Sequence, residues 1–296
     1  MPRKSTVSSS EIYDLYWNKG KSTVEISKIV GLNRCTVFYH LTKFDKPLRD
    51  RIRMVSESSR KRKIYERLPF SGDPLERQYL LGLAEDLSIE QRSKWLIIAS
   101  LTTSNQSMIE VFKKTFSKYG RILQYAISNT PYQRIMAYLD STFSFELNDQ
   151  RDYNVASLTR DELLYRLAGL IDAEGSIIIT KSNVNYINRY LAIGIENEEL
   201  IKQLANKLKE EFGIKAKVYK IRKKGDISSL RGKVLRYTKD LWSLMVHRKE
   251  DLWTLLPILP LLNNEKIKRR ELLLKTLHLI KWEEMKDYVS SSFNIS

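Results

Sequence analysis

The first 48 residues carry an apolar pattern that predicts three short helices. Apolar residues recur every three to four positions over residues 10–17, 23–30 and 33–44, a spacing that is typical of amphipathic helices. Gly31 separates the last two segments, and glycine readily adopts the left-handed backbone of a tight turn between helices. Ser27 is the small residue expected where these two helices meet. The expected core of this helix-turn-helix domain consists of Val24, Ile26, Ile29, Leu32, Val37 and Leu41.

Residues 49–73 have a different pattern and are expected to form a linker. Arg and Lys are frequent in this stretch, and its end contains Pro69 and Gly72, followed at once by Pro74. Proline and glycine interrupt helices and strands, so they mark the boundary with the next domain.

The remaining chain, residues 74–296, repeats one pattern twice. Residues 95–122 and 188–214 each read as an apolar strand, a polar turn and an amphipathic helix. We expect each helix to end at a C-cap glycine, Gly120 in the first unit and Gly213 in the second. Such self-similarity indicates an internal duplication.

Another alternation of apolar and polar residues follows each helix, so each repeat is expected to form a sheet whose two faces differ. The duplication divides this part of the chain into repeats at residues 74–157 and 158–296. The candidate strands of the second repeat are residues 177–180, 190–195, 215–222 and 234–238.

A short motif precedes each strand–helix unit. Residues 167–176 read LAGLIDAEGS and residues 80–88 read LLGLAEDLS. The former is similar to the motif that names the LAGLIDADG homing endonucleases and differs from it only at Glu174. The resemblance covers roughly residues 75–285. It implies an α+β fold, a duplicated αββαββα saddle with pseudo-two-fold symmetry, which here follows an all-α helix-turn-helix domain.

The resemblance implies that one motif helix from each repeat packs against the other at the centre of the saddle. Gly82, Ala168 and Gly169 are the small residues that would let these helices approach. Each helix then presents an acid to the floor of the DNA groove, where the family binds divalent metals. Glu174 has this place in the second repeat, whereas Asp172 corresponds to a structural acid. A hard oxygen ligand beside phosphate suits Mg²⁺.

The first motif departs from the family where the metal would bind. Aligned from Leu80, the place of the acid falls on Leu87, which cannot bind a metal, and the final glycine is replaced by Ser88. With one residue deleted from the alignment, Asp86 or Glu85 takes that place. Family members cut both strands with two acids, so a single intact acid predicts a nicking enzyme at most.

Two further catalytic positions follow from the resemblance. The family presents a lysine to the cleavage centre, and the best match is Lys275, with Lys266 and Lys268 as alternatives. Such a lysine stabilises the pentavalent phosphate or orients water. Asn197 matches a polar residue that positions water, and an ordinary turn asparagine is the alternative interpretation.

Charge adds a partner to this picture. Lys and Arg total 51 against 35 Asp and Glu, which gives a net charge of +16 at pH 7. A basic surface releases counterions when it binds phosphates, so this excess favours double-stranded DNA as the partner. The alternative, a thermophile's charged surface, would carry charges of both signs in near balance.

Three groups of residues are the expected DNA contacts. The third helix of the helix-turn-helix domain, residues 1–48, here called the head, would reach base edges in the major groove. The four consecutive basic residues of the linker would contact phosphates, unless they are merely solvated. The cations of the second repeat crowd its candidate strands. The expected contacts are Arg34, Thr36, Tyr39, His40 and Lys43 in the head, Arg60, Lys61, Arg62 and Lys63 in the linker, and Lys215, Lys217, Arg222, Lys223, Lys224, Arg231, Lys233 and Arg236 in the second repeat.

Composition also indicates the cellular setting. The one cysteine, Cys35, cannot form an internal disulfide, which favours a reducing compartment. The N-terminus lacks the apolar core of a signal peptide, and no apolar run approaches the roughly 20 residues of a membrane span. We therefore expect a cytoplasmic, nucleoid-associated monomer with neither a membrane nor a small-molecule partner.

Two functions fit these features. The first is a sequence-specific, Mg²⁺-dependent DNA endonuclease, restricted to nicking by its first motif, and the DAEG sequence of the second motif favours it. The second is a catalytically inactive DNA-binding transcription regulator derived from the same fold, which Leu87 and the N-terminal domain favour. We prefer the endonuclease.

Overall fold

The computed structural model describes residues 8–49, 66–147, 151–230 and 233–292. The chain divides into two units, Met1–Tyr65 and Glu66–Ser296, and each is described by itself. The boundary falls within the stretch predicted as a linker. Five predicted DNA contacts lie outside the described residues, as does the side chain of a sixth, Lys233: the five are Arg60, Lys61, Arg62, Lys63 and Arg231.

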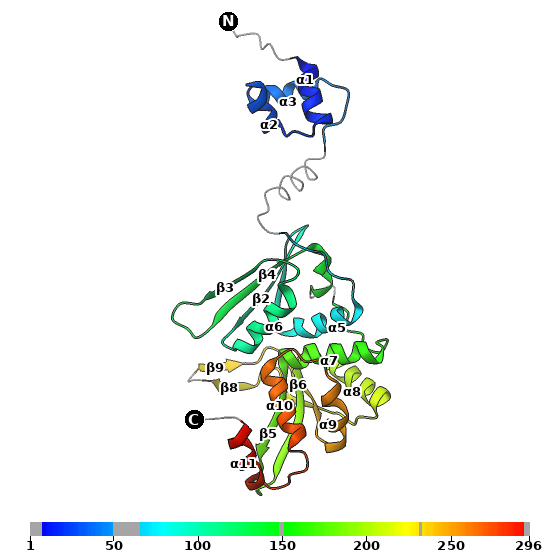
Figure 1. The fold of residues 1–296 in the computed structure, drawn as a ribbon, viewed down its shortest axis with the longest axis vertical. Helices are drawn as coiled ribbons and strands as arrows, with labels where there is room; N and C mark the ends of the chain where they lie inside the picture. The colour runs from blue at the N-terminus through cyan, green and yellow to red at the C-terminus, as the bar shows by residue number, and fades with distance from the viewer. Residues whose placement is uncertain (1–7, 50–65, 148–150, 231–232, 293–296) are drawn as a thin grey trace. The chain divides into compact units, whose positions relative to one another are not determined.

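The first unit is a small group of helices with the predicted turn between the last two (Figure 1). Gly31 has φ 68°, in the left-handed region that the turn requires. Ser27 lies at the junction, where its Oγ donates a hydrogen bond of 2.7 Å to the Leu32 carbonyl. The elements are α1 (Ser9–Tyr13), the π-helical turn η1 (Asp14–Asn18), α2 (Thr23–Val30) and α3 (Arg34–Thr42).

Two residues predicted for the core of this unit lie outside it. Val24 and Ile29 are 45% and 56% exposed, because α2 turns the face with Ile26 and Val30 inward instead. The first helical segment supplies the apolar area that the prediction omitted. The buried residues are Ile12, Leu15, Tyr16, Ile26, Val37 and Leu41.

The second unit contains two repeats of one topology. Each has a four-stranded antiparallel sheet, with strand orders β1-β2-β4-β3 and β5-β6-β10-β7. The first repeat comprises α5 (Pro74–Leu83), the 3₁₀ turn η2 (Ala84–Asp86), β1 (Ser88–Ser93), β2 (Leu96–Thr103), α6 (Gln106–Phe116), β3 (Ile122–Ala126), β4 (Gln133–Leu139) and the 3₁₀ helix η3 (Ser141–Glu146). The second comprises α7 (Arg160–Glu174), β5 (Gly175–Lys181), β6 (Ile187–Ile195), α8 (Glu198–Phe212), β7 (Lys217–Arg222) and β10 (Leu241–Val246).

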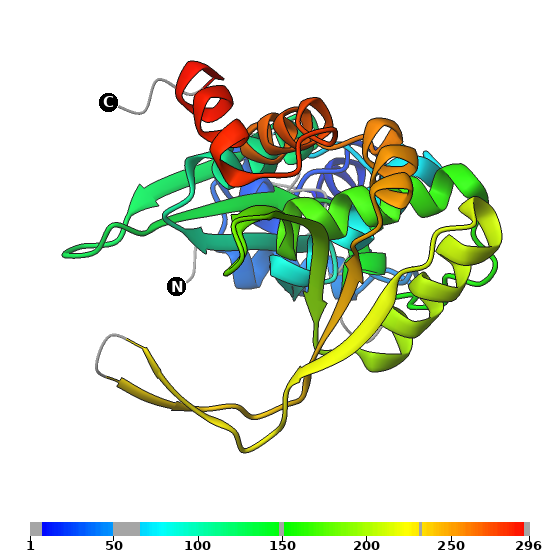
Figure 2. The ribbon, with the colours of Figure 1, turned by 90° about the horizontal axis from the view of Figure 1, so that it is seen from below.

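The second repeat also carries additions. A hairpin formed by β8 and β9 interrupts the chain between β7 and β10, so the predicted strand at 234–238 belongs to this hairpin and not to the main sheet. The β8–β9 and β3–β4 hairpins extend to the same side of the unit (Figure 2). The added elements are β8 (Ile227–Leu230), β9 (Lys233–Arg236), α9 (Lys249–Leu255), the 3₁₀ turn η4 (Leu256–Ile258), α10 (Asn264–Lys275) and α11 (Trp282–Ser292).

The two predicted C-cap glycines have different roles. Gly213 ends α8 with φ 68°, as a left-handed cap. In contrast, α6 ends at Phe116 with Ser117 as its cap, so Gly120 is not the C-cap. A Cβ on Gly120 would collide with the Tyr138 carbonyl, because β4 passes close to the backbone there.

The motif helices α5 and α7 lie side by side between the two sheets (Figure 1). A Cβ on Gly82 would lie 2.7 Å from the Leu170 nitrogen, and one on Gly169 would lie 2.9 Å from the Leu83 nitrogen. Only glycine permits this approach of two backbones. Ala168 is fully buried in the core that the two repeats share. The result is the predicted duplicated α+β fold, centred on two helices that meet at their glycines.

Candidate metal and DNA-binding site

Glu174 is placed by the end of α7. Thr159 and Glu162 form a capping box that fixes the start of the helix, and Gly175 continues directly into β5. A side chain on Gly175 would meet the backbone of Ile171, so the turn from helix to strand requires glycine. Glu174 as a residue is exposed, yet partial burial of its carboxyl and repulsion by Asp86 raise its pKa, while Lys266 opposes this shift.

Asp86 comes to the same place from the first repeat. Helix α5 ends at Leu83 and tightens into the 3₁₀ turn η2, which Asp86 completes. Leu87, the residue aligned with Glu174, is buried in the core instead. A 3₁₀ turn advances about 120° per residue against about 100° in an α-helix, so the alignment by residue count fails here. Burial raises the pKa of Asp86, and Lys266 counteracts it.

The lysine that faces these acids is Lys266, which the sequence offered as an alternative to Lys275. Its Nζ donates to the Ile171 carbonyl and, at 2.8 Å, to the Asp172 carbonyl, and so caps the end of α7. Burial lowers the pKa of Lys266, whereas Asp172, Glu174 and Asp86 raise it.

Lys275 lies elsewhere. It is nine residues further along α10, which corresponds to about 13 Å of helix, and it lines a surface hollow with Trp253 and His278. Lys268, the other alternative, is exposed. The structure therefore does not bring Lys275 to the carboxylates.

Asp172 is fully buried between the repeats. Its Oδ2 accepts hydrogen bonds of 2.7 Å from the Tyr79 hydroxyl and of 2.7 Å from the Leu262 amide. Burial raises the pKa of Asp172, and these hydrogen bonds oppose the shift. The side chain thus ties α5 to the end of α7 and points away from solvent.

Asn197 has a structural contact of its own. It is the N-cap of α8, where its Oδ1 accepts from the Leu200 amide at 3.0 Å. Asn105 caps α6 in the same way in the first repeat. Helix capping accounts for both asparagines, and the side-chain contacts of Asn197 stay within its own turn.

A divalent metal fits the pair Asp86 and Glu174. Burial and, after it, repulsion by Asp86 raise the pKa of Glu174, and a bound cation would relieve this repulsion. Among the residues that the structure describes, no group of three or more His, Cys, Asp or Glu is arranged to hold a metal. Two carboxylates suffice for Mg²⁺ beside DNA, because this ion keeps several waters and takes phosphate oxygens as ligands.

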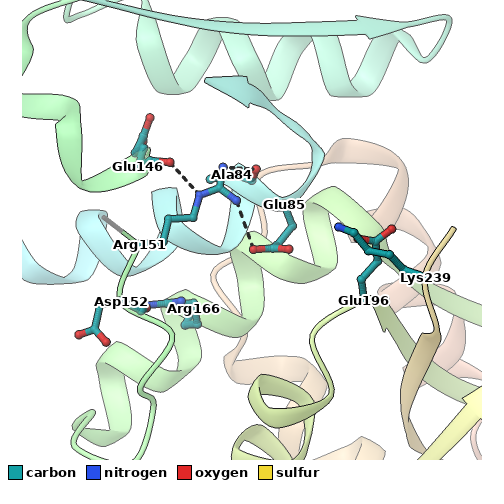
Figure 3. Close-up of polar contacts among 8 residues, drawn as sticks. All are labelled: Ala84, Glu85, Glu146, Arg151, Asp152, Arg166, Glu196 and Lys239. Atoms are coloured by element: carbon teal, nitrogen blue, oxygen red, sulfur yellow. Dashed lines mark hydrogen bonds and ion pairs between the residues drawn. The ribbon is translucent and has the colours of Figure 1, made fainter. Parts of the chain in front are cut away.

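A second cluster, which the sequence did not reveal, surrounds Glu85 (Figure 3). Arg151 donates to the Glu146 carbonyl at 2.7 Å and to the Ala84 carbonyl at 2.9 Å, and its Nη1 lies 3.5 Å from Glu85 Oε1. Burial raises the pKa of Glu85, and Arg151 and Arg166 oppose this. The charge of Glu85 is therefore balanced by arginines of the protein.

Arg166 is the buried cation of α7 in this cluster. It donates hydrogen bonds of 2.9 Å to Gln78 Oε1 and of 2.9 Å to the Asp152 carbonyl. Burial lowers its pKa to about 10, and Asp152 and Glu85 counteract the shift. An arginine three residues before Gly169, within an apolar motif, was the available signal for this contact.

The sheet of the second repeat exposes most of its predicted DNA contacts. Val218 packs against the core, so Lys217, Tyr219 and Ile221 lie on the opposite face of β7. Arg222 stacks on the Tyr237 ring at 4.4 Å. The exposed cations are Lys215, Lys217, Arg222, Lys223, Lys224 and Arg236.

The acids near these cations bind backbone amides. Asp226 accepts from the Lys223 amide at 2.7 Å, and Asp240 accepts from the Lys224 amide at 2.6 Å. Asp240 also pairs with Lys220 at 2.7 Å. These carboxylates shape the turn between β7 and the hairpin, which presents the Lys223 and Lys224 side chains to solvent.

The head presents four of its five predicted contacts. Arg34, Thr36, Tyr39 and Lys43 are exposed on α3, and the Lys43 ammonium lies 4.4 Å from the centroid of the Tyr39 ring. His40 turns toward α1, and its Nδ1 lies 2.9 Å from the Ser9 hydroxyl.

Comparison with known proteins bears on the second unit. Residues 161–259 match the sequence model of the LAGLIDADG-like domain, and no curated protein matches the chain. Full-length DUF199/WhiA from Thermatoga maritima is similar in structure at 15% identity, over 76% of this chain and 68% of that one, with a TM-score of 0.43.

Two further solved structures are similar. The N-terminal LAGLIDADG domain of DUF199/WhiA has 18% identity over 67% of this chain and 88% of its own, with a TM-score of 0.41. I-DmoI, solved with DNA and Mn, has 13% identity over 62% of this chain and 96% of its own, with a TM-score of 0.39. In the described ranges no helix has the length and hydropathy needed to cross a membrane. The sequence match thus places a LAGLIDADG-like domain at residues 161–259, within the second repeat.

Proposed function

We propose that the protein binds double-stranded DNA across its second unit and hydrolyses one phosphodiester bond at Asp86 and Glu174. The observation that carries this proposal is the position of Lys266, which caps the end of α7 and whose charge acts on two acids from different repeats, Asp86 and Glu174. The first repeat has Leu87 at the aligned position and supplies Asp86 from a 3₁₀ turn instead, so we expect this displaced acid to support cleavage of one strand only, which gives a nick.

Each residue has a distinct task in this proposal. Asp86 and Glu174 would hold Mg²⁺, which supplies charge neutralisation at the phosphate and an acidified water when bound. Lys266, anchored to the last carbonyls of α7, keeps a positive charge beside the reacting phosphate, where it stabilises developing negative charge. Asp172 fixes the helix ends and touches no substrate.

The DNA partner is supported by charge. The net charge of +16 is accompanied by exposed cations on the second sheet, and such a surface binds phosphates with release of counterions. We assign α3 of the head to base edges, with Arg34, Thr36 and Tyr39 as the reading residues. The head then adds sequence recognition to the DNA binding of the second unit.

A catalytically inactive DNA-binding regulator is the second candidate. Leu87 stands buried where the first motif would carry its acid, and the neighbouring Glu85 is paired with Arg151. For this candidate, the displaced Asp86 does not replace the missing acid, and the first repeat contributes no metal ligand. The same surface would then bind DNA without cutting it.

Nicking of a bound sequence separates the two candidates. Duplexes are first selected for binding from a random pool, and the best sequence is placed in a supercoiled plasmid. With Mg²⁺, the wild type is expected to give the open circle and little linear product. Glu174→Gln and Asp86→Asn should each reduce nicking by about 10²-fold or more, while Glu210→Gln, an exposed acid on α8, leaves it unchanged.

DNA binding without Mg²⁺ serves as the second measurement. Both acid variants should bind the selected duplex at least as tightly as the wild type, since each removes a negative charge from the groove. If the wild type binds the sequence but never nicks it with Mg²⁺ or Mn²⁺, the regulator is the correct function.

A further inference from the structure

Two cations occupy equivalent places at the ends of the motif helices. Gly82 and Gly169 are counterparts, because each lies where its helix meets the backbone of the other. The carbonyl two residues after Gly82 is that of Ala84, and Arg151 donates to it. The carbonyl two residues after Gly169 accepts from Lys266 instead.

The helices below these cations differ in length. Helix α7 stays α-helical for five residues beyond its glycine, to Glu174. Helix α5 stays so for only one, and then tightens into η2. The Leu87 amide closes η2 by donating to the Ala84 carbonyl at 3.2 Å, so this carbonyl accepts from both Leu87 and Arg151.

Arg151 is built into this turn. Its side chain is only 6% exposed, and it also reaches the Glu146 carbonyl and the Glu85 carboxylate (Figure 3). A planar guanidinium can hold three such partners in fixed directions. The contacts bridge η3 to both the first and the second residue of η2, and leave its third residue, Asp86, free to face Glu174.

We propose that Arg151 is a positioning residue that holds η2 in its 3₁₀ form and thereby sets Asp86, rather than the aligned Leu87, opposite Glu174. The inference rests on the proposed metal-binding role of these two acids. Over three residues, a return to α-helical geometry would rotate Asp86 by about 60°. Arg151 would thus restore in the first repeat the carboxylate that its motif lost.

Metal affinity tests this inference apart from cleavage. Mn²⁺ is titrated by calorimetry into the full chain bound to its selected duplex, and the Asp86→Asn, Glu174→Gln double variant provides the blank. Arg151→Ala is expected to weaken binding at the site by about tenfold or more, as for other residues that orient metal ligands. Arg92→Ala, which removes an exposed arginine paired with Glu90 in the same repeat, should have no effect.

Two further variants distinguish positioning from general stabilisation. Arg151→Lys should recover part of the affinity, since a lysine can bind the Ala84 carbonyl as Lys266 binds its counterpart. Adding Arg151→Ala to Asp86→Asn should weaken binding no further, because both act through one carboxylate.

Hydrogen exchange provides a readout that needs no metal. The Leu87 amide should exchange faster in Arg151→Ala than in the wild type and at an intermediate rate in Arg151→Lys, while amides of α7 keep their rates. If Arg151→Ala keeps the wild-type metal affinity or the wild-type exchange rate of Leu87, Arg151 does not position Asp86. If Asp86→Asn and Glu174→Gln themselves leave Mn²⁺ binding unchanged, the proposed metal site fails and takes this inference with it.

Discussion

At the end of α7 one lysine faces two carboxylates, Glu174 and Asp86, whereas at the start of η2 an arginine faces Glu85. The first group has an excess of negative charge and the potential to attract a metal ion. The second is balanced within the protein, because Arg151 already lies against the carboxylate. A duplicated scaffold has therefore kept its symmetry in the backbone while the chemistry of its two ends diverged.

The two sheets also differ in charge, because the second sheet carries the exposed cations. The exposed positions of β3 in the first repeat include Gln124 and Tyr125, whereas β7 exposes Lys217 and Arg222. In the second repeat the hairpin β8–β9 is added between β7 and β10 as a separate two-stranded sheet. Both the acid of the intact motif and most exposed cations of the second unit thus belong to the second repeat, while the first supplies a packing partner and Asp86.

The largest expected effect on stability comes from adding a side chain where α5 and α7 cross. Gly169→Ala and Gly82→Ala should each destabilise the chain by about 3 kcal/mol or more, because the new methyl meets backbone atoms that cannot move aside. Urea unfolding of the full chain measures this. Gly194→Ala, where the nearest atom is 3.9 Å away, should cost almost nothing. Tolerance of either motif substitution would show that the helices do not meet at their glycines.

This crossing was open to prediction, whereas the details of the site were not. Gly82 and Gly169 stood out because two similar motifs recur in the sequence and small residues permit close packing. Asp86 did not, since its position depends on a 3₁₀ turn, and a change in turn geometry leaves no mark in residue spacing. In the alignment of the two motifs, a gap of one residue has the same effect as that turn. The gap alone does not decide between Glu85 and Asp86.

The choice among the candidate lysines depended on a related feature that the sequence does not show. Lys266 and Lys275 lie on the same helix, and which of them reaches Glu174 depends on how α10 packs against α7. Arg151 was invisible because it lies outside the motif and acts on a backbone carbonyl. In the head, Val24 and Ile29 have the right residue type for a core, but the first helical segment decides which face of α2 is covered.

The next effect concerns Glu146, a buried acid at the end of η3 in the first repeat. Glu146 is fully buried without a hydrogen-bond partner for its carboxyl oxygens, and burial raises its pKa to about 8 from 4.5. The folded state holds this proton more tightly, so its contribution to stability is complete below pH 4.5 and is lost as the pH rises toward 8.

Glu146→Gln should abolish this pH dependence. Between pH 4.5 and 8, the free energy of unfolding of the wild type should fall relative to the variant by up to about 1.4 kcal/mol per pH unit. Urea unfolding at several pH values measures the slope. The exposed Glu210→Gln variant should follow the wild type. Parallel curves for wild type and Glu146→Gln would mean that this carboxyl is ionised inside the fold.

The smallest effect tests whether the exposed cations of the second sheet contribute to DNA binding. Replacing Lys217, Lys223 and Lys224 by glutamine removes three exposed cations from the second sheet and its hairpin turn. If each contacts a phosphate, the slope of log affinity against log salt should decrease by almost one per residue, or up to about 2.7 in total. Binding of the selected duplex at several salt concentrations gives the slope.

A matched triple variant separates this contact from net charge. Lys113, Lys114 and Lys209 are exposed on α6 and α8, helices that cover the other face of the sheets, and their replacement by glutamine removes the same total charge. Only a contact with phosphate changes the slope, whereas a general field lowers the affinity of both variants alike. Equal salt slopes for the two triple variants would therefore mean that neither sheet is the DNA-binding surface. The two repeats would then differ only in the charged groups at the ends of α7 and η2.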